Sequence, residues 1–335
     1  MSEPYRVFGS ELSPYSVKVR SYLRYKRIPH VWIPRSPAVE EEFRSYARLP
    51  LIPLVVTPLE EGLQDSTPIL ETLETRFPER SIHPEDPTLA FLSALLEEFA
   101  DEWANKWMFH YRWWREVDQR SAAARIAAQM LPERDEAERR QAAAGIRERM
   151  IGRLGFVGSS ERTRELIEES YAEGLELLEA HLDATRPYLF GGRPAFADFG
   201  LAGQLYACAT DPTAGAILRE RAPRSAAWVE RMQDPPQEGA FETRETLLPT
   251  LEPLLARPVS RLFLPWSDAN ARALERGEEE LRVELAGRPW AQKPQKYHAK
   301  SLRALRARYA AVSPREQLDA VLERSGCRRW LEGEA

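Results

Sequence analysis

Hydrophobic and polar positions in the first eighty residues follow two periods, one typical of strands and one of helices. Four short apolar runs predict β-strands, and three stretches whose apolar residues recur every three to four positions predict amphipathic helices. The strands are expected at 5–8, 30–33, 53–57 and from 63, and the helices at 15–25, 39–46 and 67–77. The order β-α-β-α-β-β-α predicts a small mixed sheet with helices on both sides.

The pattern changes at His83-Pro84-Glu85-Asp86-Pro87, which follows neither period and is the natural linker. Beyond it the pattern is helical almost throughout. Helices are expected over 89–117, 121–153, 163–182, 196–209 and 224–232. The first of these is rich in aromatic residues, and the second is rich in Ala, Arg and Glu and therefore well exposed.

From about residue 243 the chain continues beyond a compact two-domain body. Helical patterns cover 247–255, 269–276, 299–311 and 314–324, alternation over 279–285 allows a strand, and two prolines indicate a loop over 288–297. We therefore expect four parts. These are a first domain at 1–82, a linker at 83–88, an all-helical domain at 89–240 and a mostly helical C-terminal extension at 241–335.

Charge and composition exclude several classes of protein. With 47 Lys and Arg against 52 Asp and Glu, the net charge of −5 gives no support to nucleic-acid binding. No apolar run approaches the about 18 residues of a membrane span, and the N-terminus has no apolar signal core, so we expect a cytoplasmic protein. Two distant cysteines and five histidines without metal-ligand spacing argue against a disulfide framework and a metal site.

Ser13-Pro14-Tyr15-Ser16 joins the first predicted strand to the first predicted helix. The first N–H groups of a helix lack intrahelical partners and lie at the positive end of its dipole, so this position can hold an anion such as a thiolate. Pro14 suits the first helical turn. The Ser13 hydroxyl can cap the helix or turn outward to a bound sulfur, and both interpretations stay open at this point.

Four segments in order resemble the glutathione S-transferase family. Ser13-Pro14-Tyr15-Ser16 is similar to a Cys-Pro-Tyr-Cys redox motif with both sulfurs replaced, and Leu51-Ile52-Pro53-Leu54-Val55 to the family's Val-Pro-x-Leu strand with its cis-proline. Gln64-Asp65-Ser66-Thr67-Pro68-Ile69-Leu70 is similar to the family's Glu/Gln-Ser-x-x-Ile-Leu segment. The stretch from Leu178 through Tyr188-Leu189-Phe190-Gly191-Gly192 to Phe196-Ala197-Asp198-Phe199 matches the helical-domain signature.

The resemblance covers roughly residues 4–235 and implies a fold. This is a thioredoxin-like α/β domain with a mixed four-stranded sheet, followed by an all-α domain, here with an extra C-terminal extension. The departures are local. Pro50 and Leu51 stand where relatives often carry Gly-Lys, so one polar contact to the glycyl carboxylate of glutathione is expected to be lost, unless Arg48 replaces it. Ala195 leaves Asp198 with half of a capping box.

The resemblance also implies a glutathione site at Ser13, Ile52, Pro53, Asp65 and Ser66. Ser13 is the implied catalytic residue, because a hydrogen bond to the thiolate lowers the thiol pKa. The peptide groups of Ile52 can pair with the cysteinyl part of glutathione, Asp65 can accept from its ammonium, and Ser66 can donate to its carboxylate. The structural alternatives are a simple N-cap for Asp65 or Ser66 and a simple turn at Pro53.

An aromatic stripe follows the linker, with Phe99, Trp103, Trp107, Tyr111 and Trp114 about four residues apart. In the resembled family this helix borders the electrophile cleft and forms dimer contacts. The stripe is either a core or dimer surface, or an apolar substrate wall. In the second case the substrate-binding residues are Tyr15, Trp103, Trp107, His110 and Tyr111; His110 alone is more typical of a hydrogen-bonded, partly buried residue.

Met108-Phe109-His110-Tyr111-Arg112-Trp113 and the tail around Arg288-Pro289-Trp290 and Tyr297 resemble a bacterial glutathione S-transferase-like subgroup with an extended C-terminus. The tail can cap the cleft, extend a dimer interface or bind a partner. The leading hypothesis is a homodimeric transferase that conjugates the glutathione thiolate to an apolar electrophile in the interdomain cleft. The alternatives are a non-catalytic adaptor and a glutathione-dependent peroxidase or dehalogenase; serines in place of both cysteines argue against thiol–disulfide exchange.

Overall fold

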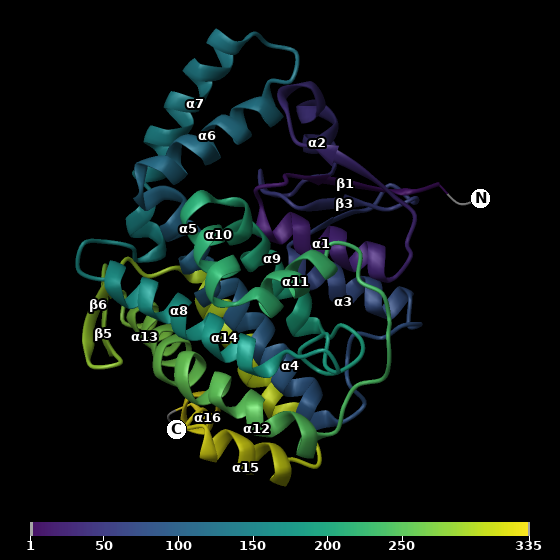
Figure 1. The fold of residues 1–335 in the computed structure, drawn as a ribbon, viewed down its shortest axis with the longest axis vertical. Coiled ribbons are helices and arrows are strands. Elements are labelled where there is room, and N and C mark those ends of the chain that lie inside the picture. The colour runs from purple at the N-terminus through teal and green to yellow at the C-terminus, as the bar shows by residue number, and fades with distance from the viewer. Residues whose placement is uncertain (1–2, 334–335) are drawn as a thin grey trace.

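The N-terminal part is a four-stranded mixed sheet with helices packed on it (Figure 1). The computed structural model describes residues 3–333. The strands are β1 (Tyr5–Gly9), β2 (His30–Pro34), β3 (Leu54–Val56) and β4 (Gly62–Gln64), and the helices are α1 (Pro14–Tyr25), η1 (Pro37–Val39), α2 (Glu40–Tyr46) and α3 (Ser66–Arg76). The strand order is β2-β1-β3-β4, with β1 parallel to β2 and antiparallel to β3. The expected fold class is confirmed.

The register of the sheet brings three chain segments to one edge. Phe8 of β1 is paired with Leu54 of β3, and Leu54 is paired in turn with Gln64 of β4. The C-terminal end of β1, the N-terminal end of β3 and the C-terminal end of β4 therefore lie side by side. The segments that leave or enter the sheet at this edge are the three that resemble the glutathione site.

Helices make up the middle of the chain. They are α4 (Pro87–Phe99), the π-helical segment η2 (Ala100–Ala104), α5 (Asn105–Trp114), α6 (Glu116–Met130), α7 (Glu136–Ile151), the 3₁₀ segment η3 (Leu154–Val157), α8 (Arg164–His181), α9 (Phe196–Thr210), α10 (Pro212–Arg221) and α11 (Pro223–Arg231). None of the helices among residues 3–333 is both long enough and apolar enough to span a membrane.

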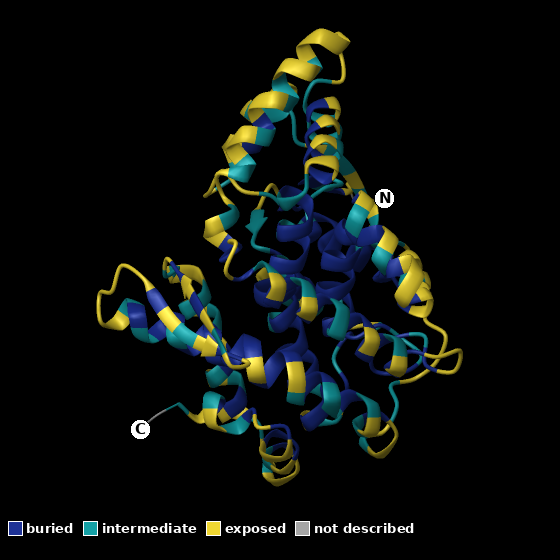
Figure 2. Ribbon diagram, turned by 60° about the vertical axis from the view of Figure 1, so that its left-hand side comes forward, coloured by how far each residue is buried: buried dark blue, intermediate teal, exposed yellow. Residues whose placement is uncertain are grey.

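Two of the expected helices differ in detail from the structure. The helix expected over 89–117 runs without a break from Pro87 to Trp114 through the π-helical segment η2, and it ends at Arg115, whose ψ of 140° is extended. The single helix expected over 121–153 is wrong, because the stretch holds two helices, and Asp135 caps the second, α7, by accepting from the N–H of Glu138. The hairpin formed by α6 and α7 projects from the body, and the outer face of α7 is exposed (Figures 1 and 2).

The C-terminal extension is a helical layer with one β-hairpin. Its elements are α12 (Arg244–Leu254), the π-helical segment η4 (Leu255–Phe263), α13 (Leu264–Glu275), β5 (Leu281–Leu285), β6 (Arg288–Gln292), α14 (Lys296–Ala311), α15 (Glu316–Arg324) and α16 (Arg328–Glu332). The strand allowed over 279–285 is confirmed as β5. The loop expected over 288–297 is wrong, because Ala286 and Gly287 both have positive φ and form a tight hairpin turn, and Pro289 is tolerated in a two-stranded sheet.

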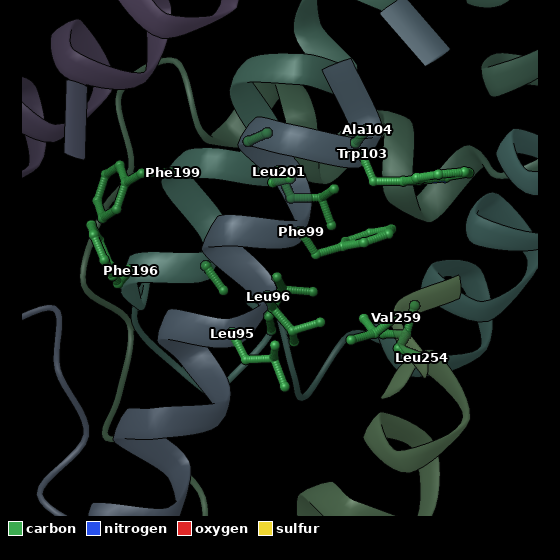
Figure 3. Packing of buried hydrophobic residues seen from close by; sticks show 14 of the residues in the cluster. Leu95, Leu96, Phe99, Trp103, Ala104, Phe196, Phe199, Leu201, Leu254 and Val259 are labelled. Atoms are coloured by element: carbon green, nitrogen blue, oxygen red, sulfur yellow. The ribbon is translucent and has the colours of Figure 1, made fainter. Parts of the chain in front are cut away.

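One continuous core joins the helical domain to the extension. Figure 3 shows Leu96 and Phe99 of α4 facing Leu254 of α12 and Val259 of η4, all buried. The extension also packs against the N-terminal half of α4, where the ring centres of Phe91 and Tyr309 are 5.8 Å apart. The extension is therefore packed as part of the body and not as an appendage.

Helix α9 fixes the start of α1. A Cβ atom at Gly203 would lie 2.6 Å from the carbonyl oxygen of Pro14, so only glycine allows this approach. At the other end of α9, Asp198 accepts from the N–H of Ala195 at 2.8 Å, which is the half capping box expected from the sequence. Its second oxygen accepts from the N–H of Leu189 and from the indole of Trp228, at 2.9 and 3.0 Å. The buried carboxylate thus ties three segments together.

Candidate functional site

Ser13 lies at the sheet edge as the N-cap of α1. Its hydroxyl oxygen accepts from the N–H of Ser16 at 3.3 Å, so the capping role is present. The hydroxyl proton makes no hydrogen bond within residues 3–333 and stays available to an incoming acceptor. Tyr15 is oriented differently, because its hydroxyl donates to the carbonyl oxygen of Asp101 at 2.9 Å. Burial, then the nearby Asp101 carboxylate, raises the Tyr15 pKa well above its usual value.

The Ile52-Pro53 peptide bond is cis, and Pro53 is buried at the start of β3. In the described part of the chain, the N–H and C=O of Ile52 have no hydrogen-bond partner. The preceding loop is held by the amide of Gln64, which accepts from the N–H of Arg48 at 2.7 Å and donates to the carbonyl of Leu51 at 2.9 Å. The unpaired peptide groups of Ile52 are therefore held in place beside Ser13.

Asp65 has a backbone conformation that is unusual for a residue with a side chain, with φ of 76°. Positive φ outside glycine is uncommon and recurs at functional sites. The Asp65 carboxylate makes no capping bond to α3, which does not fit the simple N-cap alternative. Instead, both of its oxygens accept from the hydroxyl of Tyr297, at 3.1 and 3.0 Å. Burial is the main cause of the raised pKa of Asp65.

A buried ionic cluster lies under the site. The ammonium of Lys18 donates to Asp101 at 2.7 Å, to the hydroxyl of Thr67 at 3.0 Å and to Glu97. Ser66 is buried beside it, with its hydroxyl 3.4 Å from Asp101. Burial raises the pKa of Glu97 to about 7. Because these residues come from α1, α3 and the α4–η2 junction, the cluster fixes the position of α3 relative to α1.

The aromatic stripe lies in the core. Trp103 and Trp107 are at most 1% exposed, and their indoles donate to the Ser170 hydroxyl at 3.4 and 2.7 Å (Figure 3 shows Trp103). The ring of Tyr111 packs on the ring of a tyrosine in α8, with ring centres 5.0 Å apart. His110 is buried between Ser159 and Glu168, and burial lowers its pKa. These are the contacts of the core interpretation, and the substrate role of the four residues stays a prediction.

A buried lysine joins the extension to this stripe. The ammonium nitrogen of Lys106 lies 3.7 Å from the ring centre of Trp266 and also over the rings of Trp103 and Trp290. Its hydrogen bond goes to the carbonyl oxygen of Val157, at 3.2 Å. Burial lowers the pKa of Lys106 well below its usual value. The sequence gives no signal for this contact, because Trp266 and Trp290 are about 160 and 184 positions from Lys106.

The remaining candidate groups are distant from the sheet edge or unreactive. Cys208 and Cys327 are buried and unpaired, and burial raises the pKa of both thiols, that of Cys327 to about 12. Across residues 3–333, no group of three or more His, Cys, Asp or Glu side chains is placed to hold a metal ion. A surface cavity of about 440 Å³ lies between the linker and the start of α12, and its lining includes none of the expected site residues.

The three segments of the site could be predicted from the sequence, but three contributions to it could not. These are the buried ion pair of Lys18 with Asp101, the hydrogen bonds of Gln64 to the loop before Ile52, and the contact of Tyr297 with Asp65. A lysine side chain on a helix is usually solvated, and only the burial of Lys18 where α1 packs against α3 and α9 shows otherwise. Tyr297 is 232 positions from Asp65, and no local pattern connects them. Among the residues that were not predicted, only Asp101 has a local signal in the sequence. It follows Glu97 by four positions, and this spacing puts both carboxylates on one helix face.

Comparisons with known proteins identify the family of the chain. The family model "Glutathione S-transferase, N-terminal domain" matches residues 7–81, and the model "Glutathione S-transferase, C-terminal domain" matches residues 138–231. A search of curated proteins found no match to the chain.

Similar solved structures include a glutathione transferase from Phanerochaete chrysosporium, 19% identical over 70% of this chain and 98% of that one, with a TM-score of 0.49. A β-etherase from Sphingobium sp. strain SYK-6 is 17% identical over 75% of this chain and 99% of that one, with a TM-score of 0.49. A glutathione S-transferase from Methylobacterium radiotolerans, in complex with glutathione sulfonate, is 22% identical over 72% of this chain and 97% of that one, with a TM-score of 0.38.

Proposed function

We propose that this chain, which belongs to the glutathione S-transferase family, binds glutathione at the edge of its sheet and conjugates the glutathione thiolate to an apolar electrophile. The observation that carries the proposal is the convergence of Ser13, Ile52 and Asp65 at one edge, each with a free or exchangeable polar group. Ser13 offers a hydroxyl proton, Ile52 offers an unpaired N–H and C=O, and Asp65 offers a carboxylate.

Ser13 is the proposed catalytic residue. Its hydroxyl donates to the glutathione sulfur, and the N-terminus of α1 adds a positive field at the same place. Both effects favour the thiolate over the thiol, and the thiol proton passes to solvent. The thiolate then forms a sulfur–carbon bond with the electrophile and displaces its leaving group.

The other contacts hold the peptide part of the ligand. Ile52, fixed before Pro53, pairs with the cysteinyl unit as one strand pairs with another. The ammonium of glutathione lies on Asp65, and the γ-glutamyl carboxylate on the N–H groups at Ser66, at the start of α3. No metal takes part in this proposal.

The electrophile belongs beside Ser13, and Tyr15 is the expected substrate residue that lies there. The other four proposed substrate residues, Trp103, Trp107, His110 and Tyr111, pack in the core and shape the floor of this region indirectly. A homodimer and a cytoplasmic location belong to the same proposal. Light scattering of the purified chain measures the number of subunits.

A second candidate function is that of a glutathione-binding protein without turnover. Two observations favour it. Leu51 is 62% exposed at the place of the polar contact expected to be lost, and Asp65 is already hydrogen-bonded to Tyr297. Turnover and binding therefore have to be measured separately.

Isothermal titration with glutathione tests the proposal. We expect binding to the wild-type chain, and about tenfold weaker binding to Asp65→Asn, because the amide loses the charge that holds the ammonium. Asp234→Asn is the matched control, since Asp234 is exposed and its ion pair within residues 3–333 is with Arg27 on the surface, and the affinity of this variant is expected to equal that of wild type. Absence of binding at millimolar glutathione contradicts the proposal. Binding without conjugation to any of a panel of alkyl and aryl halides supports the second function.

A further inference from the structure

Tyr297 brings the C-terminal extension to the proposed ammonium site. It lies in the first turn of α14, and its hydroxyl donates to both oxygens of the Asp65 carboxylate, at 3.1 and 3.0 Å. These are the hydrogen bonds that the Asp65 side chain makes within residues 3–333. A neutral donor from another part of the chain thus occupies the acceptor that the proposed function assigns to the ligand.

The backbone on both sides of Tyr297 is anchored. Gln295 exchanges hydrogen bonds with the side chain of Asn270, at 2.8 and 2.9 Å. The Nδ1 atom of His298 lies against the Glu102 carboxylate, and its ring packs on Trp266, with ring centres 4.9 Å apart. The segment itself is therefore fixed, and a change at Tyr297 concerns its side chain.

The ring of Tyr297 is poorly packed in comparison with its neighbours. Tyr297 is 49% exposed, whereas Tyr309 in the same helix is 3% exposed. A half-exposed ring can turn into solvent about χ1 without opening a cavity in the core, because rotamers of exposed side chains interchange readily. The hydroxyl on Asp65 holds the ring over the site, and the ring edge also meets the ring of the adjacent His298, with ring centres 6.2 Å apart.

We propose that the Tyr297 side chain is a gate on the glutathione site: its hydroxyl holds the Asp65 carboxylate in the ligand-free protein, and the ammonium of glutathione displaces it. The inference rests on the proposed function for the identity of the ligand. An ammonium wins the exchange because it brings a full positive charge to the Asp65 carboxylate, whereas the Tyr297 hydroxyl is a donor without a net charge. The gate lowers the apparent affinity for glutathione by the strength of the contact that the ligand has to replace.

Titration of Tyr297→Phe with glutathione tests the competition. The phenylalanine keeps the ring and removes only the hydroxyl, so we expect glutathione to bind roughly fivefold more tightly than to wild type, the size of one exchanged hydrogen bond. Tyr309→Phe is the matched control. It also loses a hydroxyl that donates to a carboxylate, that of Asp319 at 2.7 Å, and its affinity is expected to be that of wild type. Unchanged or weaker binding to Tyr297→Phe overturns the gate.

A second measurement tests the hydrogen bond between Tyr297 and Asp65 in the ligand-free protein. In the carbon spectrum of protein labelled at the tyrosine ring, the signal that is missing in Tyr297→Phe belongs to Tyr297. We expect this signal to shift in Asp65→Asn, and to move in wild type on addition of glutathione. An unshifted signal in Asp65→Asn overturns the gate even where glutathione binds. If the signal shifts in Asp65→Asn but glutathione binds to no variant, the proposed function and its ligand are overturned. The hydrogen bond between Tyr297 and Asp65 is then still supported.

Discussion

At the residue scale, the Ser13 hydroxyl combines a structural and a proposed chemical role. Its oxygen accepts the N–H of Ser16, and this bond orients the hydroxyl while leaving its proton unused. A capping serine and a thiolate donor are therefore compatible at one position. The two interpretations that the sequence leaves open need not exclude each other.

Replacement of Ser13 by alanine separates these two roles. We expect kcat for conjugation to fall about 100-fold, because a hydrogen-bond donor to the reacting anion is lost. The affinity for glutathione is expected to change by less than about threefold, and stability to fall by about 1 kcal/mol through the lost cap. Steady-state kinetics measure kcat, titration measures the affinity for glutathione, and urea unfolding measures the stability.

Ser36→Ala is the control for this variant, because Ser36 precedes the short helix η1 without a side-chain capping bond. Its kinetics and stability are expected to match those of wild type. An unchanged kcat in Ser13→Ala refutes the catalytic role of Ser13. It indicates that another donor near the sulfur, such as Ser16, stabilises the thiolate.

Residue identities near the sheet edge could be predicted only where the motif is local. Ser13, Ile52 and Asp65 lie in short segments whose sequence carries the resemblance, and the structure brings these segments together. The partners of Asp65 and Lys18 could not be predicted. Tyr297 reaches Asp65 across 232 positions, and such contacts depend on tertiary packing that no local period encodes.

At the element scale, the C-terminal end of α8 is held by a buried histidine. The Nε2–H of His181 donates to the carbonyl oxygen of Leu189 at 2.8 Å, and Nδ1 lies 2.8 Å from the Thr250 hydroxyl in α12. The carbonyl only accepts, so Nε2 carries the proton of a neutral ring. Burial lowers the pKa of His181 to about 4. In the neutral ring Nδ1 is an acceptor that faces the Thr250 hydroxyl, and this contact joins α8 to the extension.

This depressed pKa predicts a stability that depends on pH. Between about pH 6.5 and pH 4 the unfolded chain binds a proton at His181 that the folded chain does not, so the free energy of unfolding falls as the pH falls through this range. The full loss is on the order of 3 kcal/mol. His181→Gln is expected to show a smaller slope in urea unfolding between these pH values. Equal slopes in wild type and His181→Gln contradict the account.

Element types followed the hydrophobic period, and the errors have local physical causes. The seven expected elements of the first domain appear in the expected order, because the strands and the helices each contribute apolar side chains to a shared core. The π-helical segment η2 was missed because its composition is helical and the change lies in the hydrogen-bond register. Strand β6 was missed because Pro289 and the short Ala286-Gly287 turn conceal the alternation.

At the scale of the whole molecule, the extension is a third layer on the helical domain. Its Trp266 and Trp290 enclose Lys106, and its Leu254 and Val259 complete the core shown in Figure 3. This role could not be predicted, since the resemblance that implies a fold ends near residue 235, and the likeness of the tail to an extended subgroup leaves the position of the remaining residues undetermined. Because α14 covers part of α4, that part of the helix is not available to a second subunit.

A crystal structure of the full chain soaked with glutathione tests the central claim most directly. We expect the cysteinyl unit to pair with the backbone of Ile52, the sulfur to lie within hydrogen-bond distance of the Ser13 hydroxyl, and the ammonium to lie on the Asp65 carboxylate with the Tyr297 side chain turned away. Glutathione bound elsewhere, or an unoccupied sheet edge at millimolar glutathione with Asp65 still on Tyr297, would contradict the account.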